Sequence, residues 1–272
     1  MAKYLNIACG RIFSDHLDWL NLDYSPAAHV RGMNILEGIH TISDRFEVVY
    51  SSHFLEHVPA DMVPDFLLQC RRLTAAKGVF RVVVPDAEML MREYLKHRES
   101  GDVARADYAF LLFLDQCTRR GSGGQLAPIH RQFQQGELPE LKAYAAYLEG
   151  NHYLNPAPQR ERRGLADKAS AAIKSPGKLL KKLEPAYTRF VCSLLPKAFV
   201  AQNVSLTTVG ERHAWMYDFE SLRAKLMHAG YSTVTRQSFN TTCMPKGFFA
   251  PLDEAMGEPR KGHHQMFVEA HP

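Results

Sequence analysis

The sequence predicts an α/β fold in which a doubly wound, mostly parallel sheet of seven strands carries a large helical insertion after the fifth strand. Short, almost continuous apolar runs alternate with helical patterns through the first third of the chain, as parallel strands covered on both faces do. The same alternation returns near the end of the chain, and the region between is mostly helical in pattern. Alternation of this kind indicates right-handed βαβ units around one sheet.

Five of the expected strands lie within residues 1–86. Each is a short apolar run bounded by polar or turn-forming residues, and Pro85 stops the fifth because proline cannot donate to a sheet ladder. The runs are Tyr4–Ala8, Trp19–Asp23, His29–Asn34, Phe46–Tyr50 and Val79–Val84.

The helix expected between the fourth and fifth strands is amphipathic. Asp61 is predicted to cap its start, and Gly78 is predicted to mark the turn into the next strand. Its apolar residues recur at helical spacing on one face, and they are Val63, Phe66, Leu67, Cys70 and Leu73.

A second helix and two strands are expected near the C-terminus. Asp218 is predicted to cap this helix and Gly230 to end it. The apolar face of this helix consists of Phe219, Leu222 and Leu226. The two strands are expected at Ser232–Phe239 and Gln265–Ala270.

Composition excludes several classes of protein. Lys and Arg total 33 against 29 Asp and Glu, a net charge of +4, so neither a histone-like polycation nor a nucleic-acid binder is expected. No run of 18 apolar residues occurs, and no transmembrane helix is expected. The N-terminal residues enter a strand pattern at once, so no signal peptide is expected. Five scattered cysteines without a CxxC pair argue against a disulfide framework or structural zinc and favour a reducing cytoplasm.

Three polar features follow successive strands at the edge where open α/β sheets bind ligands. Residues 6–10, with the sequence Asn-Ile-Ala-Cys-Gly, form a small-residue turn that lets a ligand approach the backbone. Asp23 ends the second strand, where it can accept hydrogen bonds from a ribose diol, and Asn34 and Ile35 can meet an adenine. Taken singly, each is also explained as a plain turn, a helix cap or a solvated loop residue. Their ordered conjunction favours a nucleotide site.

Longer strings resemble a known family. They are residues 5–10 (LNIACG), 20–23 (LNLD), 46–57 (FEVVYSSHFLEH), 69–86, 210–218 and the helix end at 229–231. The chain resembles the class I, Rossmann-like S-adenosylmethionine-dependent methyltransferases, in the group of methyltransferase domain 11 and the ubiquinone/menaquinone-type enzymes. The likeness covers residues 3–95 and 210–270, and its most specific part is the fourth-strand string that ends in Leu-Glu-His.

Two positions depart from the family pattern. Ala8 stands where the first motif usually has glycine, and residues 76–78 (AKG) replace the usual Pro-Gly-Gly before the fifth strand. The competing dinucleotide-binding pattern needs GxGxxG at the first turn, and residues 8–13 (ACGRIF) lack two of those glycines. Neither departure from the family pattern removes Asp23, so cofactor binding is expected to be retained, in a pocket slightly narrowed at the first turn.

The resemblance implies S-adenosyl-L-methionine as the cofactor and S-adenosyl-L-homocysteine as the product. Residues 1–86 and 213–272 would form the cofactor-binding core, and residues 87–212 a lid or acceptor-binding subdomain. The first turn would lie beside the methionine moiety, and the acid after the second strand would bind the ribose. The residues after the third strand would meet the adenine, and those at the end of the fourth would line the pocket near the sulfonium. The residues so implied are Asn6, Ala8, Cys9, Gly10, Asp23, Asn34, Ile35, Ser51, Ser52 and His53.

Methyl transfer mainly requires that acceptor, methyl carbon and sulfur are held in line without water. A hydroxyl acceptor also benefits from a general base, for which histidine is suited, and the candidates are His53, His57 and His213. His57 can instead fix the start of the following helix, and His213 can pack the insertion onto the sheet. His263 and His264 are expected to be solvated, and no metal site is expected.

The insertion should decide the acceptor. Residues 159–182 hold eight basic and two acidic residues, a local charge of +6. This stretch suits an acidic or carrier-linked, phosphate-bearing acceptor, or peripheral contact with an anionic membrane, and it can also be only a solvated helix face. No aromatic residue interleaves with these charges, so single-stranded nucleic acid is not expected.

The favoured function is transfer of a methyl group to a small-molecule acceptor by in-line displacement, with oxygen slightly preferred over nitrogen. Two alternatives stay open: an enzyme that uses S-adenosylmethionine for cyclisation or rearrangement, and a non-catalytic binding protein that has kept the fold. Ala8 motivates the second. The sequence leaves the acceptor and the oligomeric state open.

Overall fold

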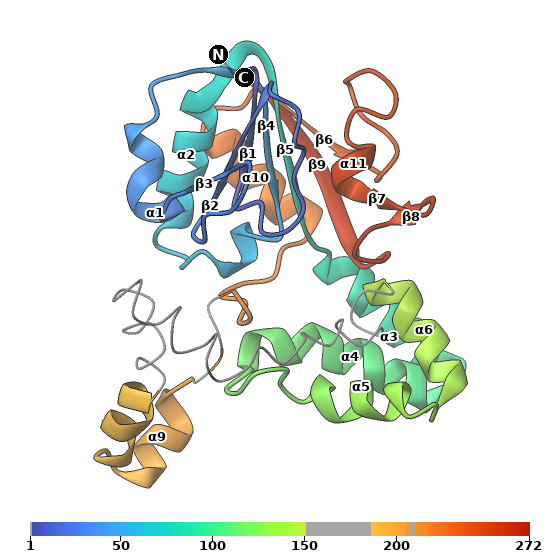
Figure 1. Cartoon of the computed structure of the whole chain (residues 1–272). Helices are drawn as coiled ribbons and strands as arrows, with labels where there is room; N and C mark the ends of the chain where they lie inside the picture. Colours follow the sequence, from blue (N-terminus) through green and yellow to red (C-terminus); the bar gives the residue numbers. More distant parts are fainter. Residues whose placement is uncertain (1, 151–185, 206, 208–209) are drawn as a thin grey trace, which may run out of the picture.

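The computed structural model describes residues 2–150, 186–205, 207 and 210–272, and it confirms the predicted α/β architecture (Figure 1). Helices cover both faces of one sheet, and a group of helices lies beyond the carboxyl ends of its parallel strands. The basic stretch 159–182 lies outside the described residues. Among the helices that are described, none combines the length and apolar character needed to cross a lipid bilayer.

The main sheet has seven strands: β1 (Tyr4–Ile7), β2 (Trp19–Asp23), β3 (Val30–Gly32), β4 (Phe46–Ser52), β5 (Thr74–Pro85), β6 (Thr233–Gln237) and β9 (Gln265–His271). Their order is β3-β2-β1-β4-β5-β9-β6, with β1 to β5 parallel and β9 antiparallel to both its neighbours. The order reverses between β1 and β4, which is where open α/β sheets bind ligands. A small separate ladder joins β7 (Glu254–Ala255) and β8 (Glu258–Pro259).

An apolar core lies on each face of the sheet. On one face the core includes residues of α1 (Ile35–Gly38), α2 (Val63–Leu73) and α10 (Phe219–His228), together with the 3₁₀ turns η1 (Ile39–Thr41) and η2 (Leu55–His57). On the other face, α11 (Ala250–Asp253) covers the strands. Successive strand residues alternate between the two cores, as the pleat requires.

The amphipathic pattern of α2 is confirmed, because its five predicted apolar residues are all buried. The predicted cap is wrong: Met62, and not Asp61, precedes the first helical residue, and no side chain caps the helix. Pro64 lies in the first turn, where a missing N–H costs little because that donor has no partner within the helix.

Gly78 does not mark the turn into β5, since α2 ends at Leu73 and the strand begins at Thr74. The glycine lies inside β5, where a Cβ atom would stand 2.8 Å from the carbonyl oxygen of Glu47. The register between β4 and β5 shifts beside this point. Gly78 therefore permits a close approach of two backbones, a contact that spacing along the chain does not reveal.

Asp218 caps α10 as predicted, its carboxylate accepting a hydrogen bond from Ser221 N at 3.0 Å. Leu222 and Leu226 are buried on the predicted face. Gly230 follows the helix with φ of +93°, the left-handed conformation that favours glycine at helix ends.

The helices beyond the sheet form an apolar core of their own. Asp86 turns the end of β5 directly into the first of them, because its carboxylate accepts a hydrogen bond from the first helical turn at 3.1 Å. Backbone hydrogen bonds tie the group to the segments that precede α10 and β9: His213 N donates to Gln116 O at 2.9 Å, and His264 N to Leu148 O at 3.1 Å. The packed helices are α3 (Ala87–Glu99), α4 (Val103–Thr118), α5 (Leu126–Gln134) and α6 (Pro139–Glu149), and α9 (Lys197–Asn203) follows later.

Arg81, in the centre of β5, is fully buried in an ion-pair network that the sequence analysis did not anticipate. Its Nε lies 2.8 Å from Asp253 on α11, and its Nη1 lies 2.8 Å from Glu269 on β9. The carbonyl oxygens of Ser238 and Thr241 accept further guanidinium protons. Burial raises the pKa of Asp253, and the guanidinium opposes this rise. The network joins β5, β9 and α11 on one face of the sheet.

Candidate active site

The turn after β1 contains two residues in the left-handed region of backbone conformation. Ala8 has φ of +55° and Gly10 φ of +57°. Gly10 N donates a hydrogen bond to Asp23 Oδ2 at 2.9 Å, which folds the turn against the end of β2. The structure thus brings together three of the residues predicted to bind the cofactor.

Asp23 is held by backbone amides on both sides. Oδ2 accepts from Gly10 N, and Oδ1 accepts from Ser25 N at 3.0 Å. The residue is half-buried, and an ionised carboxylate has about four acceptor positions. Two hydroxyl groups can therefore still bind on its open side.

Asn6 and Cys9, also predicted to meet the cofactor, have internal partners. Asn6 is buried, and its Nδ2 donates to Ile12 O at 3.2 Å and to Asn21 Oδ1 at 3.3 Å, so it holds the loop that follows the turn. Burial, with the charge of Asp23 beside it, raises the pKa of the Cys9 thiol to about 12. Cys9 is therefore protonated at neutral pH and is not a nucleophile.

Asn34 and Ile35 divide between solvent and core. Asn34 is exposed just before α1, and its side chain makes no capping hydrogen bond. Ile35 is only 4% exposed and packs in the core. The adenine contact predicted for Ile35 thus has little side-chain surface to use, whereas the Asn34 amide is accessible.

Ser51 and Ser52 end β4 on opposite faces of the sheet. Ser51 is fully buried, and its Oγ has no hydrogen-bond partner among the described residues. Ser52 is half-buried. An unpaired buried hydroxyl destabilises a fold by about 1–3 kcal/mol, and full burial leaves Ser51 no exposed surface for the cofactor contact predicted for it.

His53 has a constrained backbone and an enclosed imidazole. Its φ is +53°, and its N donates to Val83 O at 2.8 Å. Nδ1 lies 3.1 Å from Glu56 Oε1, and Nε2 lies 3.1 Å from Gln265 Oε1. Burial lowers the pKa of His53 to about 4, although Glu56 opposes the shift. Both ring nitrogens already have neighbours in the protein, so this geometry suits a positioning role better than that of a base.

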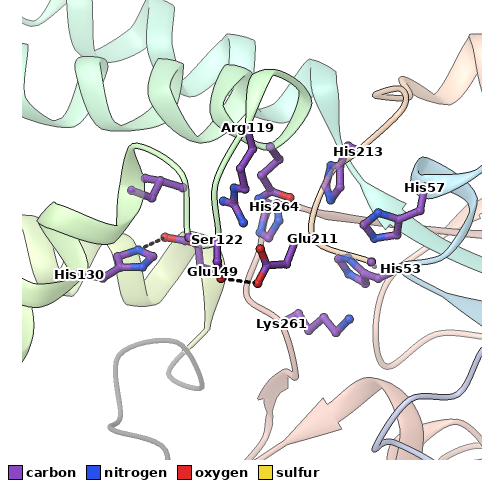
Figure 2. A pocket seen from close by; sticks show the side chains of 14 residues that line it. His53, His57, Arg119, Ser122, His130, Glu149, Glu211, His213, Lys261 and His264 are labelled. Atoms are coloured by element: carbon purple, nitrogen blue, oxygen red, sulfur yellow. Dashed lines mark hydrogen bonds and ion pairs between the residues drawn. The ribbon is translucent and has the colours of Figure 1, made fainter. Parts of the chain in front are cut away.

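A cavity of about 350 Å³ lies between the carboxyl edge of the sheet and the helices beyond it (Figure 2). This volume suits a small ligand. His53, His57 and His213 all line it, so the structure brings the three predicted catalytic histidines to one cavity. None of its lining residues belongs to the turn after β1 or to β2. The cavity is therefore distinct from the predicted nucleotide side of the edge, and His53 lies between the two.

Charges of both signs line this cavity. Arg119 is paired with an aspartate of α4 at 2.7 Å, and Glu149 lies 3.3 Å from His130. Burial lowers the pKa of Lys261 to about 8, although the charge of Glu56 opposes the shift, so its ammonium remains charged at neutral pH. The lining therefore suits a polar ligand that both donates and accepts hydrogen bonds.

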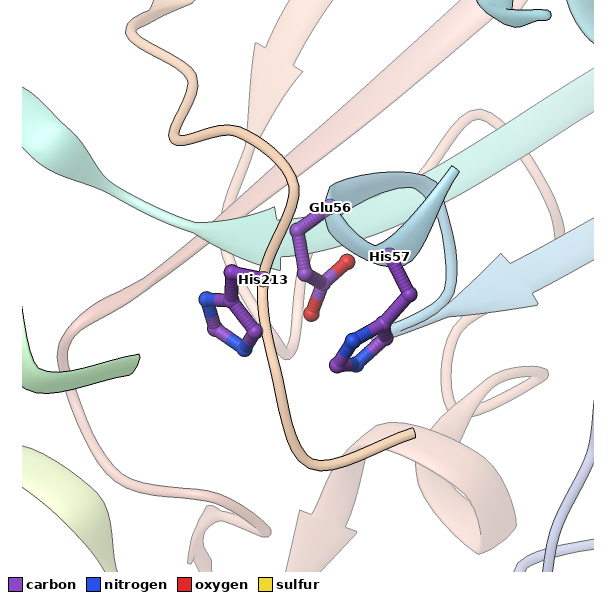
Figure 3. A group of neighbouring side chains, drawn as sticks. All are labelled: Glu56, His57 and His213. Carbon is purple, nitrogen blue, oxygen red and sulfur yellow. The ribbon is translucent and has the colours of Figure 1, made fainter. Parts of the chain in front are cut away.

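Glu56 is the site residue that sequence reasoning missed. It is completely buried between His57 and His213, whose rings approach to 4.8 Å between centroids (Figure 3). Burial alone would raise its pKa, but the adjacent imidazoles, His53 foremost, lower the pKa of Glu56 to about 2, so it is ionised. Its position within the Leu-Glu-His string was the available signal, but only the fold shows its surroundings.

Comparison with known proteins gives likenesses to solved structures, while no family model and no curated protein matches the chain. A methyltransferase dependent on S-adenosylmethionine, from Archaeoglobus fulgidus, aligns with 99% of this chain and 85% of its own, at 10% identity and a TM-score of 0.39. PKMT2 from Rickettsia typhi, in complex with AdoHcy, aligns with 99% of this chain and 49% of its own, at 14% identity and a TM-score of 0.38. DhpI in complex with SAH aligns over 31% of this chain and 50% of its own, at 25% identity and a TM-score of 0.27. The chain spans about half the length of the DhpI and PKMT2 chains. The strand order establishes the fold independently of these likenesses.

Opposite substitutions in the turn after β1 should change stability in opposite directions. Ala8→Gly is expected to raise the free energy of unfolding by about 0.5–1 kcal/mol, because it relieves a left-handed alanine at some cost in chain entropy. Gly10→Ala should lower it by about 1–2 kcal/mol, and no atom within 4 Å obstructs the added methyl group. Urea unfolding measures both, and equal signs would contradict the conformational explanation.

Acid is expected to destabilise the fold in part through His264. The expectation that His264 is solvated is wrong, since its side chain is buried against the helices beyond the sheet, with Nδ1 2.6 Å from Leu148 O. Burial lowers the pKa of this imidazole. Because the unfolded chain binds the proton more readily, the contribution is fully present above about pH 6.5 and is lost as pH falls below it. In urea unfolding, His264→Asn should therefore flatten the fall in stability toward about pH 5.5. The exposed His16→Asn should leave the slope unchanged, and an unchanged slope in His264→Asn would refute the assignment.

Proposed function

We propose that this protein is an S-adenosyl-L-methionine-dependent methyltransferase that acts on a small polar acceptor and releases S-adenosyl-L-homocysteine. The observation that carries the proposal is the arrangement at the strand ends beside the β1/β4 switch point. There the Gly10 amide and the half-buried Asp23 carboxylate meet, and the exposed Asn34 follows at the end of the next strand. A sulfur-bearing tail, a ribose diol and an adenine edge match these groups in order.

The cofactor and the acceptor would occupy different parts of the sheet edge. The nucleoside would lie over the turns after β1, β2 and β3, and the acceptor would fill the cavity of about 350 Å³. His53 borders the cavity at the end of β4, near the point where the methyl group would cross. Residues 1–86 and 213–272 would then act as the cofactor-binding core, and residues 87–212 as the lid or acceptor-binding subdomain.

The reaction is an in-line displacement. A lone pair of the acceptor, an oxygen in preference to a nitrogen, attacks the methyl carbon while the carbon–sulfur bond breaks and its electrons return to sulfur. The protein's main contribution is to hold the three atoms in line without water. Burial lowers the pKa of His213 to about 3 and that of His53 to about 4, which makes both weak bases. His57 is half-buried and its Nδ1 donates to Arg212 O at 2.9 Å, so its Nε2 would take the proton of a hydroxyl acceptor.

The setting of the enzyme forms part of the proposal. The described cysteines are all free thiols, which supports a reducing cytoplasm. The stretch 159–182, with its net charge of +6, would bind either a phosphate-bearing carrier of the acceptor or the headgroups of an anionic membrane.

Two measurements on the full chain test the proposal. Calorimetry should detect binding of S-adenosylhomocysteine, and incubation with labelled S-adenosylmethionine should transfer label to members of a panel of hydroxylated and aminated polar molecules. Absence of binding would refute the proposal. Binding with a product that has not gained one methylene would indicate rearrangement chemistry, and binding with no turnover would indicate a non-catalytic protein.

A further inference from the structure

We propose that Glu56, His57 and His213 bind a divalent metal ion of the zinc class at the wall of the cavity. A carboxylate oxygen and one ring nitrogen from each histidine lie within 4.8 Å of one another. Figure 3 shows the Glu56 side chain directed between the two imidazoles. His57 lies on the same turn as Glu56, and His213 lies on a separate segment of the chain. This differs from the expectation, drawn from sequence spacing, that no metal site is present.

Glu56 is a buried carboxylate without a hydrogen-bond donor. Its side chain is 0% exposed, and neither oxygen accepts a hydrogen bond from any described residue. Burying an ionised carboxylate costs several kcal/mol unless a positive group compensates it. The position therefore favours a cation beside Glu56.

His53, the imidazole nearest to Glu56, does not supply the missing donor. Gln265 Nε2 donates to Gly262 O at 2.7 Å, so its Oε1 is the atom that accepts from His53 Nε2. His53 Nδ1 lies 3.1 Å from Glu56 Oε1, yet neither oxygen of Glu56 has a hydrogen-bond partner among the described residues. The carboxylate is therefore open to a cation beside His57 and His213.

The imidazoles of His57 and His213 can each offer a ring nitrogen to a metal. The Nδ1–H of His57 donates to Arg212 O at 2.9 Å, and His213 Nδ1 faces the sulfur of Met216 at 3.5 Å. Each ring is thus left with Nε2 as its free lone pair. A backbone carbonyl on the opposite ring nitrogen is the usual way in which proteins orient a metal-binding histidine.

The two chain segments that supply these ligands are locked together. Glu56 O accepts hydrogen bonds from Ala214 N at 2.6 Å and from Trp215 N at 3.1 Å, while His213 N donates to Gln116 O at 2.9 Å. The ligands therefore approach one another without any rearrangement of the backbone. A pre-formed site loses less entropy when the metal binds.

The ligand set and its surroundings indicate the class of metal. Two imidazoles and one carboxylate are the protein ligands of one common type of catalytic zinc site, which keeps a fourth position open. His57 and His213 both line the cavity, so the open position would face the space proposed for the acceptor.

Titration with Co²⁺ alone tests the site in the full chain after treatment with a chelator. One equivalent should bind with a visible d–d absorption, and Zn²⁺ should displace it. Glu56→Gln, His57→Gln and His213→Gln should each weaken binding by about a hundredfold or more, since loss of even an outer partner costs ten- to a hundredfold. His263→Gln is the matched control, because His263 pairs with Glu258 at 3.0 Å outside this cavity, and it should not change binding.

Circular dichroism confirms that each variant is folded, and the half-buried His57 keeps the test usable if a change at Glu56 or His213 disrupts folding. Failure of Co²⁺ to bind, or equal binding by the folded His57→Gln and His263→Gln variants, overturns the inference. Calorimetry with S-adenosylhomocysteine on the same sample separates the two proposals. A chain that binds S-adenosylhomocysteine but not Co²⁺ overturns only the metal site. A chain that binds Co²⁺ but not S-adenosylhomocysteine overturns only the methyltransferase assignment.

One consequence rests on the proposed function. The open position of the metal would bind the acceptor oxygen and lower the pKa of its hydroxyl, so the hydroxyl would release its proton to water before it attacks the methyl group. His57 would then serve as a ligand and not as the base. Methyl transfer should then fall in the presence of a chelator and return with Zn²⁺, while affinity for S-adenosylhomocysteine stays constant. Transfer that is unaffected by the chelator contradicts this role.

Discussion

Asp23→Ala is expected to weaken the binding of S-adenosylhomocysteine by about a hundredfold or more. Two hydrogen bonds from a ribose diol to an ionised carboxylate contribute about 1.5–3 kcal/mol each, and about 1.4 kcal/mol corresponds to a tenfold change in affinity. The substitution also removes the acceptors for Gly10 N and Ser25 N, which should loosen the turn after β1. Calorimetry at one fixed temperature and pH measures the change.

Asp18→Ala is the matched control for this substitution. Asp18 is a partly exposed acid just before β2, paired with Lys3 at 3.9 Å, and it does not contact the turn of Ala8 and Gly10. Its loss should change the affinity by less than about twofold, as expected for a surface charge. Equal affinity of Asp23→Ala and the unmodified chain would remove the main support for a nucleoside at this edge.

Arg81→Met is expected to lower the free energy of unfolding by about 3–5 kcal/mol, the usual effect of removing one partner of a buried ion pair. The substitution leaves Asp253 and Glu269 buried without their shared cation. It also removes donors from the carbonyl oxygens of Ser238 and Thr241. Urea unfolding followed by circular dichroism gives the change.

Two further variants separate lost charge pairing from lost packing. Arg92→Met removes an exposed arginine that is paired with Glu88 at 2.6 Å, and it should cost at most about 1 kcal/mol. Combining Arg81→Met with Asp253→Asn and Glu269→Gln should recover part of the stability, because no unpaired charge then remains buried. A combined variant less stable than Arg81→Met alone would show that charge pairing is not the dominant effect.

Local physics explains why much of the fold could be predicted. The bounds of β2 agree with the structure residue for residue, because its apolar run ends in a charged residue at the sheet edge. The helical face of α2 and the Asp218 cap of α10 were also predictable, since both depend on neighbours within one or two turns of helix.

Predictions failed where the role of a residue depends on its contacts with a segment that is distant along the chain. Asp61 was expected to cap α2 and Gly78 to end it, yet the helix begins without a side-chain cap and the glycine serves the contact of β5 with β4. Ile35 was predicted to lie beside the adenine, but it packs in the core beneath α1 and is buried there. A sequence pattern alone cannot separate such alternatives, because the deciding neighbour lies in another element.

The chain's own pattern determined the alternation of strands and helices, and with it the edge at which Gly10, Asp23 and Asn34 gather. These depend on periodicity and turn chemistry, which act over a few residues. Only the tertiary structure decided what surrounds Glu56 and Arg81, because their partners lie far along the chain, such as His213 beside Glu56 and Asp253 beside Arg81. The effect of a buried charge on stability depends on the groups that replace water around it, and these groups come together only when the chain folds.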